Sequence, residues 1–204
     1  GETAGAGVTT GDGNVFIGNE QSDFIGGIRV INTGHWITNN YFYKIKGNEF
    51  RSALAVMNGI PKSPLNRYNQ VTDVVVAYNT YIDCISPFQF GVGANVDKKD
   101  VLPASEIRSA SPERMLVANN LVYNHVPDTN PIINYDDVSG ITFKNNVFNS
   151  ENKSSVTNNG LITQALELNK LSEALYAPSQ NLEDVYNGFD FDKITTDLFG
   201  ADRQ

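Results

Sequence analysis

The segment Phe143-Lys144-Asn145-Asn146-Val147-Phe148 sets an asparagine between two short apolar pieces, and the chain repeats this arrangement four more times. The other copies are Gly11-Asp12-Gly13-Asn14-Val15-Phe16, Ile37-Thr38-Asn39-Asn40-Tyr41-Phe42, Val76-Ala77-Tyr78-Asn79-Thr80-Tyr81 and Val117-Ala118-Asn119-Asn120-Leu121-Val122. The repeat markers Asn14, Asn40, Asn79, Asn120 and Asn146 are spaced by 26, 39, 41 and 26 residues. A period in the twenties that is twice lengthened by a loop indicates a solenoid.

The marker asparagine has a physical reason to recur between strands. It tolerates the left-handed backbone conformation better than other non-glycine residues, so we expect it to turn the chain sharply. Its amide can satisfy backbone groups in the bend, and amides of successive coils can stack into a ladder. The flanking valine, isoleucine, phenylalanine and tyrosine residues are strand formers.

A second strand-like run follows the marker in four of the repeats. These runs cover residues 26–32, 52–58, 87–92 and 131–135. Each repeat therefore holds at least two short strands and no amphipathic stretch of helical length, which predicts an all-β fold, a right-handed parallel β-helix. A leucine-rich repeat would need recurring leucines, and a β-sandwich would not explain the fixed phase of the asparagine.

The two ends of the chain differ from the repeats. We expect residues 1–150 to form the coils and residues 151–204 to form a C-terminal capping segment of the same domain. The apolar residues from Leu161 to Leu175 have roughly helical spacing, so we expect the cap to be irregular or partly helical and to cover the last open coil. Residues 1–13 hold too little apolar material for a cap, so the chain is expected to continue a longer solenoid.

Composition limits the classes of partner. The 204 residues suffice for one domain with a sizeable core. The net charge of −8 argues against a nucleic-acid partner, and no long apolar stretch predicts a membrane span. Residues 1–70 nevertheless hold six lysines and arginines against five acids, so the first third remains compatible with an anionic polysaccharide. Cys84 is the only cysteine, which excludes an intrachain disulfide, and we expect it to be buried.

Several blocks resemble polysaccharide lyase family six, which includes chondroitinase B and many alginate lyases. In chain order these blocks are Gly26-Gly27-Ile28-Arg29-Val30-Ile31, Gly34-His35, Asn39-Asn40-Tyr41-Phe42, Arg51-Ser52-Ala53-Leu54, Met57-Asn58-Gly59, Val117-Ala118-Asn119-Asn120-Leu121 and Gly140-Ile141-Thr142-Phe143-Lys144-Asn145-Asn146-Val147-Phe148. Leu175-Tyr176-Ala177-Pro178 and Asp197-Leu198-Phe199-Gly200-Ala201-Asp202-Arg203 resemble the segment that closes the family's catalytic domain. The resemblance covers nearly the whole chain but only the later part of that catalytic domain.

The resemblance implies β-elimination on a uronate-containing polysaccharide, alginate first and dermatan or chondroitin sulfate second. In the family a lysine removes the C5 proton and an arginine assists. A Ca²⁺ held by an Asn/Glu/Glu set neutralises the charge that develops on the uronate carboxylate. The resemblance also implies an acidic polysaccharide as partner and a secreted or periplasmic location.

The sequence departs from the family where the catalytic residues should be. It contains neither the Leu-Arg-His-Gly segment of the arginine nor an Asn-x-Glu-x-Glu set for the metal. Asn152-Lys153-Ser154 matches the family's lysine segment in letters but follows the last repeat, so we interpret Lys153 as a solvated loop residue. We therefore expect the catalytic and Ca²⁺-binding segments to lie upstream, in a missing N-terminal half of the β-helix. The catalytic residues stay unknown, and this chain alone is expected to be inactive and to bind no metal.

Four residues are candidates for substrate binding: Arg29, Arg51, Arg67 and Tyr68. Strand alternation places Arg29 outward between Ile28 and Val30, where it could bind a uronate carboxylate or pair with a neighbouring acid. Arg51 matches a basic position of the family. Arg67 and Tyr68 belong to a loop that lengthens one repeat, where Tyr68 could stack on a sugar or pack on the coil.

Other cations and the histidines carry weaker expectations. Lys62 is interpreted as solvated, and the insertion from Gly93 to Pro112 offers Lys98, Lys99 and Arg108 as further binding candidates. His35 and His125 lie far apart and are expected to be structural. A non-catalytic carbohydrate-binding β-helix, or a purely structural one, remains the alternative function.

Overall fold

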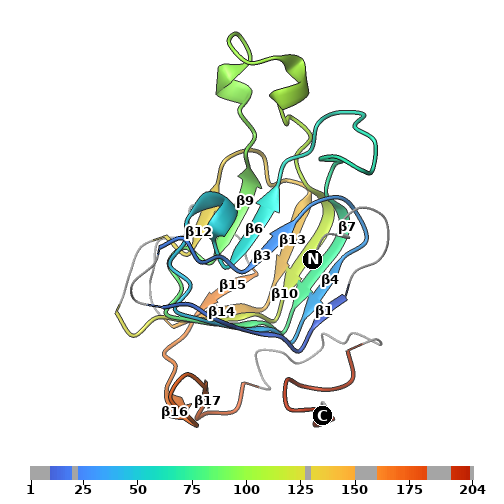
Figure 1. The fold of residues 1–204 in the computed structure, drawn as a ribbon. Helices are drawn as coiled ribbons and strands as arrows, with labels where there is room; N and C mark the ends of the chain where they lie inside the picture. The colour runs from blue at the N-terminus through green and yellow to red at the C-terminus, as the bar shows by residue number, and fades with distance from the viewer. Residues whose placement is uncertain (1–9, 20–22, 127–129, 150–159, 183–193, 203–204) are drawn as a thin grey trace.

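Short parallel strands wind around a common axis in three sheets (Figure 1). The computed structural model describes residues 10–19, 23–126, 130–149, 160–182 and 194–202. The first sheet contains β1 (Thr10–Asp12), β4 (Trp36–Thr38), β7 (Thr72–Ala77), β10 (Glu113–Ala118) and β13 (Ile141–Lys144). The second contains β2 (Val15–Ile17), β5 (Tyr41–Tyr43), β8 (Thr80–Ile82), β11 (Leu121–Tyr123), β14 (Asn146–Phe148) and β15 (Leu161–Thr163). The third contains β3 (Ile28–Val30), β6 (Leu54–Met57), β9 (Phe88–Val92) and β12 (Ile132–Asn134).

Strand register confirms the predicted parallel β-helix. Met115 of β10 pairs in parallel with Val74 of β7 and with Ile141 of β13, and the pairing continues residue by residue along the strands. The four runs expected after the markers form the third sheet, β12-β9-β6-β3. Each full coil therefore visits the first, second and third sheets in turn, and every coil buries its apolar side chains against its neighbours.

The marker asparagines form the predicted ladder at the corner between the first and second sheets. Each Nδ2 donates to the Oδ1 of the next marker at 2.9 Å, from Asn14 through Asn40, Asn79 and Asn120 to Asn146. Each Oδ1 also accepts the backbone N–H of the preceding marker, at 2.9 to 3.2 Å. The amides are thus satisfied inside the molecule, as buried polar groups require.

The expectation that the marker itself takes the left-handed conformation is wrong. The residue before it does: Gly13, Asn39, Tyr78, Asn119 and Asn145 have φ between 51° and 66°. The two adjacent residues have different roles. The preceding residue makes the turn, and the marker's side chain can then point inward and stack on the next marker. Only glycine or asparagine fills that position except at Tyr78, which tolerates the same backbone strain.

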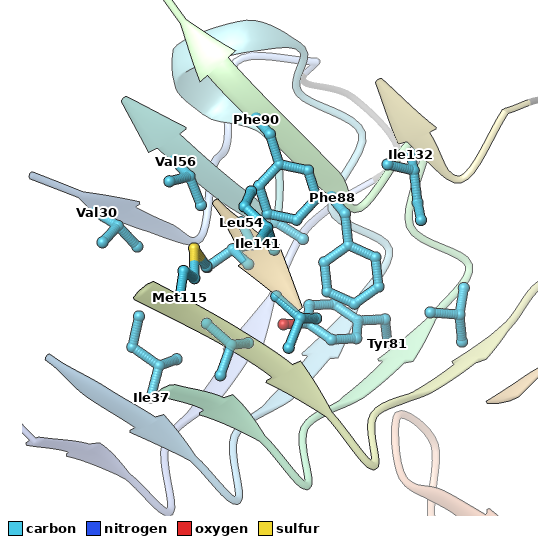
Figure 2. Close-up of a cluster of buried hydrophobic side chains, with 14 of the residues drawn as sticks. Val30, Ile37, Leu54, Val56, Tyr81, Phe88, Phe90, Met115, Ile132 and Ile141 are labelled. Carbon is cyan, nitrogen blue, oxygen red and sulfur yellow. The ribbon is translucent and has the colours of Figure 1, made fainter. Parts of the chain in front are cut away.

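The interior holds stacked aromatic and aliphatic side chains. The rings of Phe16, Phe42 and Tyr81 stack from coil to coil, with centroids 4.8 Å and 4.6 Å apart. Figure 2 shows Tyr81 and Phe88 among the aliphatic residues that fill the space between the three sheets. Cys84 is buried as expected, and burial raises the pKa of its thiol to about 12.

Two long loops lengthen the repeats at one corner. Residues 58–71 connect β6 to β7, and residues 93–112 connect β9 to β10 and carry the short helices η2 (Val96–Lys98) and η3 (Ala104–Glu106). Both loops leave the solenoid where the third sheet gives way to the first, at the top of Figure 1. A further short helix, η1 (Glu49–Arg51), precedes β6.

The helical spacing between Leu161 and Leu175 allowed a partly helical cap, but the structure forms no helix there. Residues 161–163 are strand β15, which pairs with β14 and extends the solenoid beyond residue 150. Residues 168–170 and 176–178 form the antiparallel hairpin β16 (Leu168–Lys170) and β17 (Tyr176–Pro178). The described part of the tail lies along the outer side of the second sheet (Figure 1), and Leu166 and Leu182 pack there against Tyr41, Leu121 and Val147. Lys153 and the rest of 150–159 lie outside the described residues.

Within the described residues, no helix has the length and apolar character needed to span a lipid bilayer.

Candidate functional site

Arg29 stands on the outer side of the third sheet. Val30 is buried and Ile28 packs against the interior cluster, so alternation along β3 turns Arg29 outward to solvent. Its Nη2 donates to the backbone oxygen of Phe50 at 3.3 Å, and its guanidinium carbon lies 5.2 Å from the centre of the Phe50 ring. The arginine is therefore held against an aromatic surface with part of its donor set still directed to solvent.

An apolar patch continues this outer surface across β6 and β9. Ala55, Met57 and Val92 are buried there under Ile31, Phe50 and Tyr68. The patch exists because outward positions of the third sheet are covered by η1 and by the loop that follows β6. Arg29 and Arg108 pack on the aromatic rings of this patch.

Arg108 lies at the other end of the patch. Its guanidinium carbon is 3.9 Å from the centre of the Tyr68 ring, and its Nη1 donates to the oxygen of Gly93 at 3.3 Å. A Cβ on Gly93 would collide with that Nη1, so glycine permits the close approach. The Nε is buried and has no hydrogen-bond partner among the described residues.

We call Arg29, Phe50, Tyr68 and Arg108 the basic face. Neither arginine forms an ion pair with a described residue. Arg29 is exposed, whereas Arg108 is half-buried with its Nε enclosed. A pair of fixed guanidinium groups beside aromatic rings suits a polymer that carries carboxylates or sulfates on sugar rings.

Polar contacts brace the loops around the basic face. The Nδ2 of Asn58 donates to the backbone oxygen of Arg108 at 2.9 Å and to the Oδ2 of Asp136. Gln89 accepts from the backbone N–H of Glu49 at 2.8 Å and from the hydroxyl of Tyr135 at 2.9 Å. Burial, with the nearby Glu49 charge, raises the pKa of Tyr135. These bonds tie five segments together across the third sheet.

The four candidates from the sequence are not all brought together. Arg29 and Tyr68 belong to the basic face, where one face of the Tyr68 ring is occupied by Arg108. Arg51 is exposed at the opposite corner of the sheet, with its guanidinium carbon 5.2 Å from the Phe24 ring. Arg67 is exposed in its loop, and its side chain forms no hydrogen bond or ion pair with the described residues.

Two residues of the basic face were not among the four main candidates from the sequence. Phe50 was not predicted at all, and Arg108 was only a weaker candidate. Arg108 was one of three cations in a long insertion, and nothing in its spacing shows that the insertion folds back over β6. Phe50 directly precedes Arg51, and only the short η1 turn reveals that its ring, not the Arg51 guanidinium, lies under Arg29. The one signal in the sequence is that both insertions stand between a second strand-like run and the next marker asparagine, which places them at the same corner of the solenoid.

The described residues do not fit the Ca²⁺ that the resemblance implies. No group of three or more histidine, cysteine, aspartate or glutamate side chains among them could hold a metal ion. His125 is occupied by Asp83, whose carboxylate oxygens lie 2.9 and 3.0 Å from its Nδ1. The Nε2 of His35 lies 2.6 Å from the backbone oxygen of Ile31.

Comparison with known proteins gives two kinds of match. A family model described as chondroitinase B matches residues 5–192. Among solved structures, the alginate lyase AlyGC of family PL6 is 36% identical over 87% of this chain, with a TM-score of 0.73. An arginine-to-alanine mutant of AlyGC is 35% identical over 87% of the chain, also with a TM-score of 0.73. The chain spans only 23% and 22% of those two chains. No curated protein matches it.

Proposed function

The chain belongs to the chondroitinase B family, and from that membership we propose that it is part of a lyase cleaving a uronate-containing polysaccharide by β-elimination. Alginate is the first proposed substrate, because the similar solved structures are alginate lyases. Dermatan or chondroitin sulfate is the second, because the matching family model bears the name of a chondroitinase. We also propose a secreted or periplasmic location, where such polymers are found.

The observation that carries this proposal is the pair of unpaired arginines on the basic face. Arg29 and Arg108 flank the Phe50 and Tyr68 rings, and neither has an acidic partner among the described residues. Charge-assisted hydrogen bonds to carboxylates contribute roughly 1.5–3 kcal/mol each before solvent screening. Exposure reduces this contribution, so the basic face suits a polymer that repeats the same weak contact many times.

The role of this chain in the reaction is to bind and orient the substrate. In β-elimination a base removes the C5 proton of the uronate and the C4 glycosidic oxygen leaves, while negative charge develops on the carboxyl group. Arg29 is proposed to bind a uronate carboxylate and to hold the sugar ring against Phe50. Arg108, clamped by Tyr68 and Gly93, is proposed to bind an acidic group of a neighbouring sugar. No proton transfer is assigned to a described residue.

A second candidate function is non-catalytic binding of an acidic polysaccharide. It is favoured by the same basic face together with the missing Leu-Arg-His-Gly and Asn-x-Glu-x-Glu segments. Both functions need Arg29 and Arg108 to contact the polymer, and they differ only in turnover.

Affinity electrophoresis of the chain through gels containing alginate, dermatan sulfate or neutral dextran tests the proposed partner. Migration is expected to be retarded most by alginate, less by dermatan sulfate and not by dextran, with the retardation lost as salt screens the charges. Equal retardation by dextran, or none by either acidic polymer, would remove the basis of the proposal.

A further inference from the structure

Glu49 lies directly before Phe50 of the basic face, and its backbone is in an unusual conformation. Its φ is 50°, in the left-handed region that few residues other than glycine, asparagine and aspartate adopt. The short helix η1, which begins at Glu49, lies against β3, β6 and β9. The side chain is exposed, and its carboxylate forms no hydrogen bond or ion pair with a described residue. Strained backbones of this kind persist only where the surrounding structure holds them, and they concentrate at functional sites.

A buried glutamine holds Glu49 in this conformation. Gln89 is 0% exposed, and its Oε1 accepts the backbone N–H of Glu49 at 2.8 Å and the hydroxyl of Tyr135 at 2.9 Å. Its Nε2 donates to the Oδ1 of Asn48 at 2.7 Å and to the backbone oxygen of Ser86 at 3.3 Å. Both atoms of the amide thus have two partners each, and the backbone of Glu49 is fixed beside the basic face.

Strand register places Glu49 and Arg29 on opposite sides of Phe50. Arg29 of β3 pairs with Ala55 of β6, and Ala55 pairs with Gln89 of β9, so the three residues form one row across the sheet. Phe50 packs over Ala55 in the middle of this row. Neighbouring strands lie about 4.8 Å apart, so the ends of the row are separated by about 10 Å. The positive charge therefore stands at the β3 end, and Glu49 is tied to the β9 end.

The negative charge of Glu49 also lies on the β9 side. Tyr135 follows β12, the strand beyond β9, and donates its hydroxyl to Gln89. Burial, and after it the charge of Glu49, raises the pKa of Tyr135, so the carboxylate is close to that hydroxyl. A sugar resting on Phe50 would therefore meet a guanidinium at one edge and a carboxylate at the other.

One uronate ring has polar groups that match these two edges. In a pyranose ring C2 lies opposite C5, so the carboxylate on C5 and the hydroxyl on C2 project from opposite edges. A uronate whose carboxylate contacts Arg29 across Phe50 would direct its C2 hydroxyl toward Glu49. A hydroxyl can donate to a carboxylate, which only accepts. A sulfate at C2 would remove that donor and bring a like charge to Glu49.

We propose that Glu49 is a specificity-determining residue, which accepts a hydrogen bond from the C2 hydroxyl of the uronate bound by Arg29 and excludes uronates that are sulfated there. The proposal rests on the proposed function, because it needs an acidic polymer on the basic face. It narrows the substrate class to uronate polymers with free C2 hydroxyls, of which alginate is one.

Titration calorimetry of the full 204-residue chain tests the proposal, with an alginate hexamer and the same hexamer sulfated on its C2 and C3 hydroxyls. The two ligands carry the same carboxylates. The wild type is expected to bind the sulfated hexamer at least about threefold more weakly. Glu49→Gln should bind the sulfated hexamer at least about tenfold more tightly than the wild type does, because the repulsion is removed. Its affinity for the unsulfated hexamer should fall no more than about fivefold, because the amide oxygen still accepts.

Glu113→Gln is the matched control, since Glu113 is an exposed glutamate on β10 of the first sheet, and both affinities should stay within twofold of the wild type. Glu49→Asn is the second variant if the glutamine variant does not fold. Asparagine accepts the left-handed backbone without the charge, and this variant should lose the discrimination as well.

Three results would overturn this proposal and leave the proposed function intact. They are equal binding of both hexamers by the wild type, an unchanged ratio of the two affinities in the Glu49 variants, and the same change of ratio in Glu113→Gln. Binding of neither hexamer by the wild type would overturn the proposed function and this proposal with it.

Discussion

At the scale of single residues, the stability of the solenoid depends on whether buried polar groups find partners. Asn79 makes four side-chain bonds: its Oδ1 accepts from the backbone and amide nitrogens of Asn40, and its Nδ2 donates to Ile37 and Asn120. Tyr81 makes none among the described residues, although its hydroxyl is fully buried. Asn79 thus follows the rule that buried polar groups are hydrogen-bonded, and Tyr81, two residues later, departs from it.

Asn79→Ala should lower the free energy of unfolding by about 3 kcal/mol or more, because several buried donors and acceptors lose their partner at once. Urea unfolding followed by circular dichroism measures the change. Asn14→Ala is the control, since Asn14 is the exposed end of the same ladder and should lose much less. Equal losses in the two variants would show that the ladder does not depend on burial.

Tyr81→Phe should stabilise the protein by about 1–3 kcal/mol, because it removes a buried hydroxyl that has no hydrogen-bond partner. Tyr41→Phe is the opposite case, since the Tyr41 hydroxyl accepts the backbone N–H of Tyr176 at 3.0 Å and its loss should cost about 0.5–1.5 kcal/mol. Thermal unfolding of both variants compares them. A lower melting temperature for Tyr81→Phe would show that the hydroxyl is satisfied after all.

At the scale of elements, the strands of the coils were predictable from sequence and the tail was not. The strands beside each marker can be recognised locally, because β-branched and aromatic residues flank a recurring asparagine. Leu168 and Leu175 are seven residues apart, which is helical spacing, yet both pack with Leu166 against the outer side of the second sheet, a surface far away in the sequence. Such a tertiary contact overrides local propensity, and no local pattern reports it.

Contacts between segments far apart in the sequence also explain why the candidate site could be predicted only in part. Alternation within β3 predicted that Arg29 points outward, because a strand's period is local. The stacking of Arg108 on Tyr68 joins two loops that are 40 residues apart (108 − 68). Loop conformation depends on contacts between loops, so the sequence could name both as candidates without showing that they meet.

Leu166→Ala should cost about 2 kcal/mol, because Leu166 is 8% exposed and anchors the tail on the second sheet. Leu171→Ala is the matched control, since Leu171 is 54% exposed at the hairpin and should change stability by less than about 0.5 kcal/mol. Urea titrations of both variants test whether the tail is an integral part of the fold. Indistinguishable midpoints would mean that the tail adds no stability.

At the scale of the whole molecule, the described residues include the proposed binding surface and no residue that we propose as catalytic. The purified 204-residue chain is therefore expected to bind alginate without cleaving it. Cleavage would appear as ultraviolet absorbance of the unsaturated product, and steady turnover would show that catalytic residues lie within this chain.

The measurement that tests the central claim most directly is the affinity of the chain for an oligomer of uronate, determined by titration calorimetry for the wild type and two arginine variants. Arg29→Ala should weaken binding about tenfold or more, because one charge-assisted contact to a carboxylate is lost. Arg114→Ala should leave it within twofold, since Arg114 is another exposed arginine, which pairs with Asp73 on the first sheet. Unchanged affinity in Arg29→Ala, or equal losses in the two variants, would contradict the assignment of the basic face as the polysaccharide-binding surface.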